Sequence, residues 1–384
     1  MGDRHLPYSL PDIGEEEIAS VTTALRSGWV SSGPLVPEFE RRFAEQCGTG
    51  VVAVAVNSAT AGLHLALEAL AIGPGMEVLV PTWTWTASAE IVVHLGADPV
   101  FVDVDPETLA LDLDAAAAAV TARTAAVIPV HFAGRPISGA ALRSFAASHG
   151  LAVVEDAAHA FPAASAGVPV GGGDSSATVF SFYATKPITT GEGGMVVTRD
   201  ASLAARVRTM RLHGLDRDAY ARYRSERPAW QLDVVAAGFK YNLTDPAAAL
   251  GLVQLRRAEQ MRARREWIAE RYREAFADLP LDLPAPVPGG DQHAWHIFEV
   301  RIRPDAPIDR DRFVDELSRM GVSTGLHFIP LHTFTYWRTR YALTDEMFPV
   351  ASREFSRVVS LPLFSAMSDA QVDLVAGVVR KALQ

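Results

Sequence analysis

The sequence predicts an α/β protein built on a seven-stranded, mostly parallel β-sheet and followed by a smaller α+β unit. Short apolar runs succeed one another between residues 51 and 198, with amphipathic stretches of helical period between several of them. Near-continuous apolar strands that alternate with helices are typical of parallel sheets covered on both faces. A charged, helix-forming run then begins near residue 246. We therefore expect a large domain over residues 1–245, and a linker helix with a small domain over 246–384.

The individual elements follow from hydrophobic periodicity. Helices are expected at 15–26 and through Phe39 and Phe43. The predicted strands of the sheet are 51–56, 77–81, 99–103, 125–130, 151–155, 177–182 and 195–198, and the helices among them are 61–71, 87–95, 113–120 and 139–148. The C-terminal unit should contain strands 293–302 and 322–327 and helices 309–320 and 368–383, the last opened by a capping box at Ser368.

Composition narrows the class of protein. The net charge of −10 argues against nucleic acid or an anionic membrane surface as a partner. The single cysteine, Cys47, cannot form an internal disulfide and lies in a predicted helix, which favours a buried structural thiol. The apolar runs are far shorter than a membrane span, and the first residues lack the apolar core of a signal peptide. We expect a soluble, cytoplasmic protein.

Two motifs after the first strands suggest a ligand site, because ligands of such sheets bind at the carboxyl ends of the strands. Asn57–Gly62 places small residues and Thr60 at a helix N-terminus, where free N–H groups and the helix dipole favour a phosphate. A plain helix cap at Ser58 or Thr60 is the alternative. Trp83 and Trp85 follow the next strand, and one of them could stack on a planar heterocycle instead of packing in the core.

Two further residues complete the pattern. Asp156 ends an apolar strand, where a buried carboxylate is costly unless it meets a cation such as a protonated pyridine nitrogen. A capping aspartate is the alternative. Lys186 follows another strand and precedes a Thr/Gly-rich loop, a setting that suits Schiff-base chemistry more than solvent exposure. Phosphate site, aromatic plate, aspartate and lysine occur in the chain order of a fold-type I (aspartate aminotransferase-like) pyridoxal 5'-phosphate (PLP) enzyme.

These residues also carry a resemblance to the DegT/StrS family of nucleotide-sugar aminotransferases. It covers nearly the whole chain from Ile13 onward. The matching segments are 58–63, 155–159, 181–194, 238–245, 294–296 and 324–328. Within the family, Arg211–Gly214 and Tyr241–Asp245 look closest to enzymes that aminate C4 of a 4-keto sugar. Tyr183 and Pro187 depart from the commonest pattern, which has histidine and asparagine there.

The resemblance implies a role for each matching residue. Lys186 would bind PLP as a Schiff base and Asp156 would pair with the pyridine nitrogen, with Trp85 stacked on the ring and His159 near its hydroxyl. The residues implied to hold the phosphate are Thr60, Ala61, Ser181 and, from the partner subunit of a homodimer with shared active sites, Asn242.

The implied reaction is a ping-pong transamination that serves amino-sugar biosynthesis. Glutamate would donate the amino group, pyridoxamine 5'-phosphate (PMP) would carry it, and a nucleotide-linked keto sugar would accept it. Lys186 would move the proton between donor and cofactor, so its pKa should be depressed. The alternatives are a 3-aminotransferase acting on a 3-keto sugar and a non-catalytic regulatory homologue. A sugar dehydratase of the family is disfavoured, because that chemistry goes with histidine at the position of Lys186.

Four histidines of the C-terminal part are candidates for ligand contacts. His327 and His332 flank an apolar tetrapeptide, and His293 and His296 precede a predicted strand. Without cysteines or clustered carboxylates beside them, we expect no metal site. We predict that His327 and His332 contact the sugar or diphosphate, with a structural role as the alternative.

Overall fold

The computed structural model describes residues 5–217 and 231–384. Its main sheet has seven strands in the order β1-β9-β8-β5-β4-β2-β3. Their bounds are β1 Val52–Val56, β2 Glu77–Pro81, β3 Asp98–Val102, β4 Thr124–Val127, β5 Ala152–Asp156, β8 Ala177–Ser181 and β9 Gly194–Thr198. Only β9 runs against its neighbours, β1 and β8. The predicted mostly parallel sheet is confirmed, and every strand predicted for it is present.

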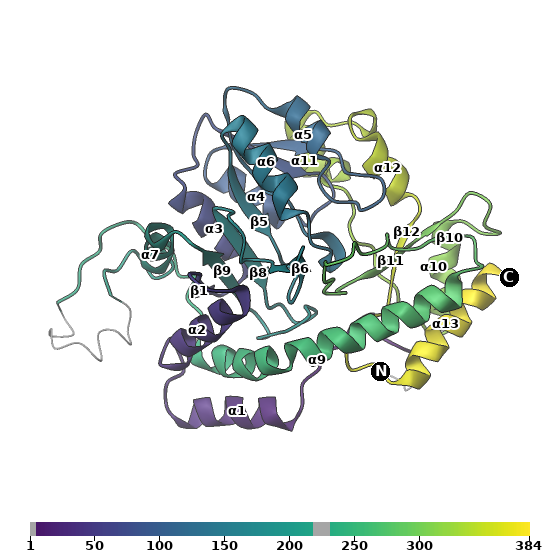
Figure 1. The fold of residues 1–384 in the computed structure, drawn as a ribbon, viewed down its shortest axis with the longest axis horizontal. Helices are drawn as coiled ribbons and strands as arrows, with labels where there is room; N and C mark the ends of the chain where they lie inside the picture. The colour runs from purple at the N-terminus through teal and green to yellow at the C-terminus, as the bar shows by residue number, and fades with distance from the viewer. Residues whose placement is uncertain (1–4, 218–230) are drawn as a thin grey trace.

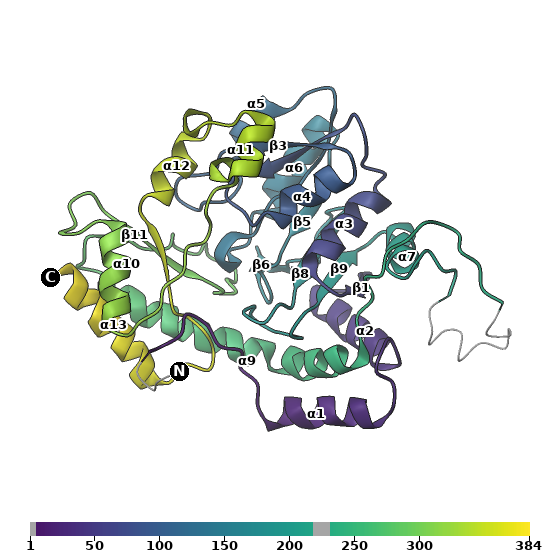
Figure 2. The same cartoon turned by 180° about the vertical axis from the view of Figure 1, so that it is seen from behind.

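Helices cover both faces of this sheet (Figures 1 and 2). They are α1 Glu15–Arg26, α2 Leu35–Cys47, α3 Ala59–Ala69, α4 Ala87–His94, α5 Leu113–Ala119, α6 Gly139–His149 and α7 Ala201–Met210. Alternate side chains of β1 serve the two faces: Val54 and Val56 pack with α3, whereas Ala53 and Ala55 pack with the phenylalanines of α2. Cys47 is buried in the second cluster, and burial raises the pKa of its thiol to about 12. It is the structural thiol that was expected.

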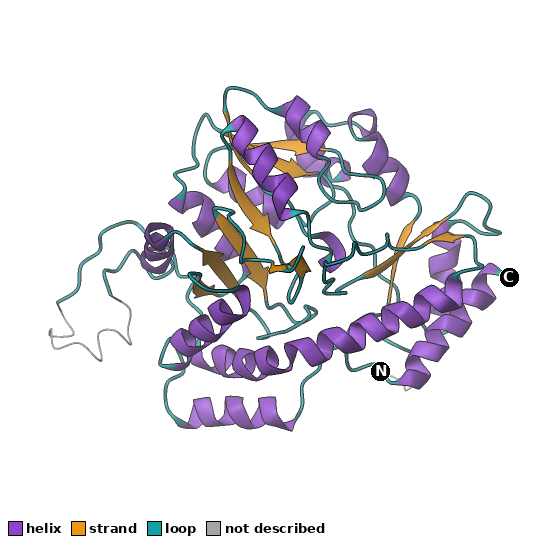
Figure 3. Ribbon diagram, in the orientation of Figure 1, coloured by secondary structure: helices purple, strands orange, loops and turns teal. Residues whose placement is uncertain are grey.

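A long helix, α9 (Asp245–Phe276), leads from the main sheet to the C-terminal part, as Figures 1 and 3 show. Thr244 caps it, and a proline occupies its first turn. Beyond it lies a small antiparallel sheet, β10-β11-β12, made of Leu281–Asp282, Phe298–Ile302 and Val358–Leu361. The helices here are α10 Arg310–Arg319, α11 Thr335–Tyr341, α12 Pro349–Phe355 and α13 Asp369–Leu383. The remaining elements are β6 Ala164–Ser165, β7 Val168–Pro169 and three single 3₁₀ turns, η1 Phe132–Gly134, η2 Leu331–Thr333 and η3 Asp345–Met347.

The prediction of a strand at 322–327 was wrong. Val322 pairs with Leu6 of the N-terminal segment, and Gly325 pairs with Ser360 of β12, each through an isolated bridge. The backbone bonds of this stretch therefore go to two different partners, and no continuous ladder forms. The capping box at Ser368 is confirmed.

The C-terminal part packs partly against the main sheet and partly against α9. Phe328, Trp337 and Ala351 belong to the core cluster around the main sheet, whereas Phe298 and Val359 belong to the cluster between α9 and the small sheet. The boundary at residue 245/246 stays a proposal, which the start of α9 supports. Among the described residues, no helix combines the length and the apolar character that crossing a bilayer requires.

Candidate active site

A cavity of about 520 Å³ opens at the carboxyl ends of the strands of the main sheet. The segments that follow β1, β2, β5 and β8 form one side, and a C-terminal loop forms the other. Of the residues predicted from the sequence, it brings together Thr60, Trp85, Asp156, His159, Ser181, Lys186 and His327. Residues separated by more than 260 positions in the chain, such as Thr60 and His327, thus line one cavity.

Asp156 ends β5 and is almost fully buried. Its Oδ2 accepts a hydrogen bond from Ser88 Oγ at 2.8 Å, and its Oδ1 accepts one from the Ala158 N–H at 3.0 Å. The Ser88 hydroxyl in turn contacts Thr84 Oγ1 at 2.9 Å. Because Ser88 donates to the carboxylate, it accepts from Thr84. This chain fixes the carboxylate without neutralising its charge, so the aspartate can still pair with a cation in the cavity.

Lys186 lies in the loop after β8, whose turn is closed by a hydrogen bond from its N–H to the Tyr183 carbonyl (3.0 Å). Burial lowers the pKa of its ammonium from 10.5 to about 8, against a smaller opposing effect of Asp156. Across the part of the chain that the structure describes, no carboxylate forms an ion pair with Lys186. A larger fraction of the amine is therefore neutral and nucleophilic near neutral pH than for an ordinary lysine.

The N-terminus of α3 faces the same cavity. Ser58 caps the helix by accepting from the Ala61 N–H at 3.1 Å, and Ser58, Ala59 and Thr60 line the cavity. Gly194 of β9 permits this approach, because a Cβ there would lie 2.6–2.7 Å from the backbone of Ser58 and Ala59. With the Ser181 hydroxyl opposite, the helix end offers N–H groups and hydroxyls to an anion.

Aromatic rings surround the remaining volume. The side chain of Trp85 is 62% exposed, whereas Trp83 is buried in the core. His159 stacks on Phe328, with ring centroids 5.4 Å apart, and lies 4.4 Å from the ring of His296. Burial, and secondarily the charge of Lys186, lowers the pKa of His159 well below its usual value. Its Nδ1 is buried and has no hydrogen-bond partner among the described residues, so it is free for a ligand.

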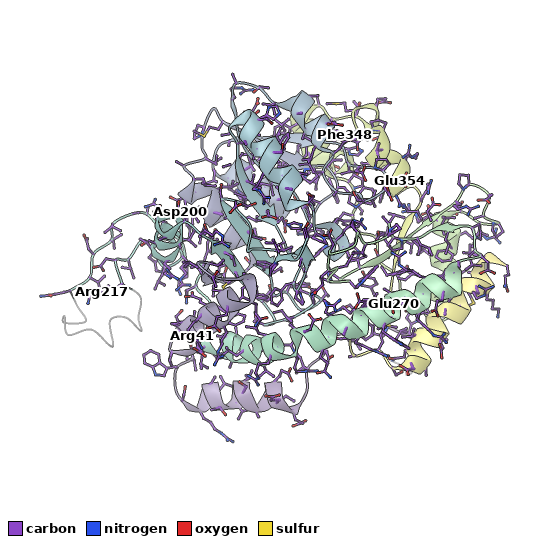
Figure 4. All side chains as sticks on the ribbon, viewed as in Figure 1. Arg41, Asp200, Arg217, Glu270, Phe348 and Glu354 are labelled. Atoms are coloured by element: carbon purple, nitrogen blue, oxygen red, sulfur yellow. The ribbon has the colours of Figure 1, made fainter. Side chains whose placement is uncertain are left out.

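Three predicted residues lie off the cavity wall. Ala61 is buried in the first turn of α3. Asn242 bonds Ser32 through its amide (2.8 Å) and is also bonded by Lys240. His332 is fully buried, bonded to Thr82 (2.8 Å) and Ser352 (3.0 Å), and stacked on Phe348, which Figure 4 labels in the C-terminal segment. These contacts fit a structural role, which was the alternative for His332. The predicted role of His332 in substrate binding has no support from its position.

Several residues of the site were missed from the sequence. Thr84 and Ser88 are four positions apart near a helix start, a spacing that permits a bond between their hydroxyls but gives no indication that Ser88 bonds Asp156. Phe328 and His296 reach the cavity only through the tertiary packing of the C-terminal part.

Tyr183 lines the cavity, and the Pro187 carbonyl accepts from the buried Arg265 at 3.0 Å. The two departures from the common family pattern thus lie on either side of Lys186 in the chain, and only Tyr183 faces the cavity. Among the described residues there is no group of three side chains able to hold a metal ion.

Comparisons with known proteins decide the family. The model of the DegT/DnrJ/EryC1/StrS aminotransferase family matches residues 11–380. The chain belongs to this family. It is 45% identical over 378 residues to the spore coat polysaccharide biosynthesis protein SpsC of Bacillus subtilis, covering 98% of this chain and 96% of that one.

Solved structures of the family agree in fold and cofactor. The sugar aminotransferase Spr1654 of Streptococcus pneumoniae, in a PMP form, is 32% identical, covers 99% of this chain and 98% of that one, and superposes with a TM-score of 0.89. DesI, solved in the presence of its TDP-sugar product, is 35% identical, covers 100% and 94%, and gives 0.86. A DegT-family aminotransferase is PLP-dependent, as predicted, and has the fold-type I architecture.

The donor set of the cavity fits PLP. A carboxylate for the ring nitrogen, an amine for the aldehyde, an unpaired histidine nitrogen and an anion-binding helix end are the groups that this cofactor requires. We assign the ring nitrogen to Asp156, the aldehyde to Lys186 and the phosphate to the N-terminus of α3 with Ser181. This assignment of residues is a proposal.

The depressed pKa of Lys186 gives a first prediction. In cofactor-free protein, the rate at which an acylating reagent modifies Lys186 should rise with a midpoint at about pH 8, because burial destabilises the ammonium. Peptide mass spectrometry after labelling across pH measures this, and exposed Lys381 in the same digests is the control. Labelling of Lys186 with a midpoint near the ordinary lysine value of about 10.4 would contradict the burial argument.

The hydroxyl chain behind Asp156 gives a second prediction. Ser88→Ala should lower kcat about threefold to tenfold, because the carboxylate loses one donor worth about 0.5–1.5 kcal/mol. Ser88→Thr, which keeps the hydroxyl, should recover most of the activity. Ser148→Ala is the matched control, since that hydroxyl bonds only its own helix (Phe145 carbonyl, 2.9 Å). Unchanged kcat in Ser88→Ala would show that the Ser88 hydroxyl does not support catalysis.

Proposed function

We propose that the protein transfers the amino group of glutamate to C4 of a nucleotide-linked 4-keto sugar. The observation that carries the proposal is the shared cavity of Lys186, Asp156 and the N-terminus of α3 in a chain of a sugar aminotransferase family. Similarity to DesI, which was solved with a TDP-sugar product, supports a nucleotide-linked acceptor. The position C4 rests on the runs Arg211–Gly214 and Tyr241–Asp245, and glutamate as donor rests on the family resemblance.

Each residue has a defined task in this proposal. Bound PLP supplies an aldehyde that accepts amines and a protonated ring that withdraws electrons. Lys186 Nζ would hold the aldehyde carbon. Because burial lowers the pKa of its ammonium to about 8, a neutral fraction of the amine would be present near neutral pH to accept a proton from the donor's α-carbon. The Asp156 carboxylate would pair with the ring nitrogen, and Ser88 and Ala158 hold the carboxylate.

We also propose a cytoplasmic homodimer with shared active sites. Asn242 lies beside the carboxyl end of β1, where it pairs with Val56, but it does not line the cavity of its own subunit. A partner subunit that brings its Asn242 to the phosphate site would explain the resemblance at this position. Gel filtration with light scattering measures the oligomeric state, and a monomeric active enzyme would contradict shared sites.

Absorbance of the holoenzyme tests the proposed function in two steps. Glutamate alone should remove the absorbance of the aldehyde form of the cofactor, and a nucleotide 4-keto sugar added afterwards should restore it. Glutamate-driven loss without recovery by any nucleotide keto sugar would leave an aminotransferase that acts on another acceptor. A protein that binds no cofactor would agree with the regulatory alternative.

A further inference from the structure

The N-terminal segment around Leu6 and Tyr8 reaches the active site, although it lies about 180 positions before Lys186. Leu6 pairs with the loop at 321–323, since its N–H donates to the Gly321 carbonyl (2.8 Å) and its carbonyl accepts from Ser323 N–H (3.0 Å). This pairing brings Tyr8 against His327, with ring centroids 5.2 Å apart and an interplanar angle of 26°. His327 lines the cavity that also holds Lys186.

Glycine at position 325 makes room for the pair. A Cβ at this position would lie 2.8 Å from His327 Cε1 and 3.2 Å from Tyr8 Cε2. Gly325 is itself fixed to Ser360 of β12 by two backbone hydrogen bonds of 2.9 and 2.8 Å. The imidazole is therefore confined between a tyrosine ring, a backbone without a side chain and the Ser360 hydroxyl.

Two hydroxyls meet at one ring nitrogen of His327. His327 Nδ1 lies 3.0 Å from Ser360 Oγ and 3.4 Å from the Tyr8 hydroxyl. An unprotonated Nδ1 can accept from either hydroxyl, whereas a protonated Nδ1 could only donate to one of them. Because two hydroxyl donors face this nitrogen, the unprotonated state of Nδ1 is favoured, and a neutral imidazole then carries its proton on Nε2.

We propose that Tyr8 and Ser360 are positioning residues that hold His327 as an Nε2–H donor, directed to an oxygen of the keto-sugar substrate. A neutral donor suits a sugar hydroxyl or carbonyl, whereas the carboxylates of an amino donor favour a cation. Burial, and then the charge of Lys186, lowers the pKa of His327 to about 4, so the ring is neutral at physiological pH. The proposal deepens the proposed function, on which its substrate part rests.

The ring nitrogens report the tautomer directly. In holoenzyme labelled with ¹⁵N-histidine, the signals of His327 are identified by their loss in His327→Gln. We expect a protonated Nε2 and a bare Nδ1 in the wild type, and a shift towards a mixture of tautomers in Tyr8→Phe/Ser360→Ala, which keeps the stacked ring but removes both hydroxyls. A wild-type ring protonated on Nδ1 overturns the proposal. This readout does not depend on turnover, so it stands apart from failure of the proposed function.

Half-reaction kinetics test the substrate part. Tyr8→Phe/Ser360→Ala should raise KM for the nucleotide keto sugar about threefold to tenfold, the loss of about one net hydrogen bond. The rate at which glutamate converts the cofactor should stay within about twofold of wild type. Tyr341→Phe, which changes a hydroxyl that contacts Arg340, is the control. Unchanged KM overturns the proposal, and so does an equal loss in the glutamate step. Melting curves that match the wild type show that each variant is folded.

Discussion

Lys186→Ala will abolish transamination, with a loss of at least about a thousandfold in kcat. On the proposed assignment, the substitution removes both the amine that holds the cofactor and the group that carries the proton, and no other lysine of the described residues lines the cavity. Turnover with glutamate and a nucleotide keto sugar measures the loss. Absorbance should show that the cofactor still enters the site, because Asp156 and the α3 N-terminus are unchanged.

Lys381→Ala is the matched control for this experiment. Lys381 lies exposed on α13 and should retain full activity when changed. Transamination by Lys186→Ala at more than a few per cent of the wild-type rate would mean that another base moves the proton, and the assignment of Lys186 would have to be abandoned.

Asp156→Asn will lower kcat about a hundredfold or more. The asparagine has nearly the same shape, but its amide nitrogen replaces one of the two oxygens that accept from Ser88 and the Ala158 N–H. The change therefore removes the negative charge and at most one of these two hydrogen bonds. Loss of one partner of a buried charge pair costs about 3–5 kcal/mol. Steady-state kinetics and cofactor absorbance measure the effect.

Asp174→Asn controls for removal of a carboxylate as such, because Asp174 is 69% exposed and pairs only loosely with Arg143 (3.7 Å). Its activity should equal that of the wild type. If Asp156→Asn kept more than about a third of the activity, the pairing of Asp156 with the ring nitrogen would be refuted.

The sequence predicted the sheet well because buried parallel strands are apolar along their whole length. The runs that form β2 and β8 could be predicted as strands without knowing which strands they pair with. The stretch at 322–327 looks equally strand-like, but its partners, Leu6 and Ser360, are fixed by tertiary packing, which local periodicity does not encode. Asp156 was found because a buried carboxylate at the end of an apolar strand is costly unless it meets a cation, and Lys186 because it follows another strand and precedes a Thr/Gly-rich loop.

Other parts of the site had weaker signals. Ser88 and Thr84 were typical helix-start residues, and only the fold brings their hydroxyls to Asp156. Tyr8 lies 319 positions from His327, a separation across which the sequence gives no indication of contact. His332 and His327 both flank the apolar tetrapeptide 328–331, yet the fold buries His332 against Phe348. Position relative to a strand end was therefore predictable, whereas contacts between distant segments were not.

Transfer of ¹⁵N from labelled glutamate to a nucleotide sugar tests the central claim most directly. The holoenzyme is incubated with ¹⁵N-glutamate and, in parallel reactions, with a nucleotide 4-keto sugar and a nucleotide 3-keto sugar, and the products are analysed by mass and NMR. The account predicts a product from the 4-keto sugar whose ¹⁵N is bonded to C4. Amination of the 3-keto sugar alone, or no ¹⁵N in either sugar, would contradict it.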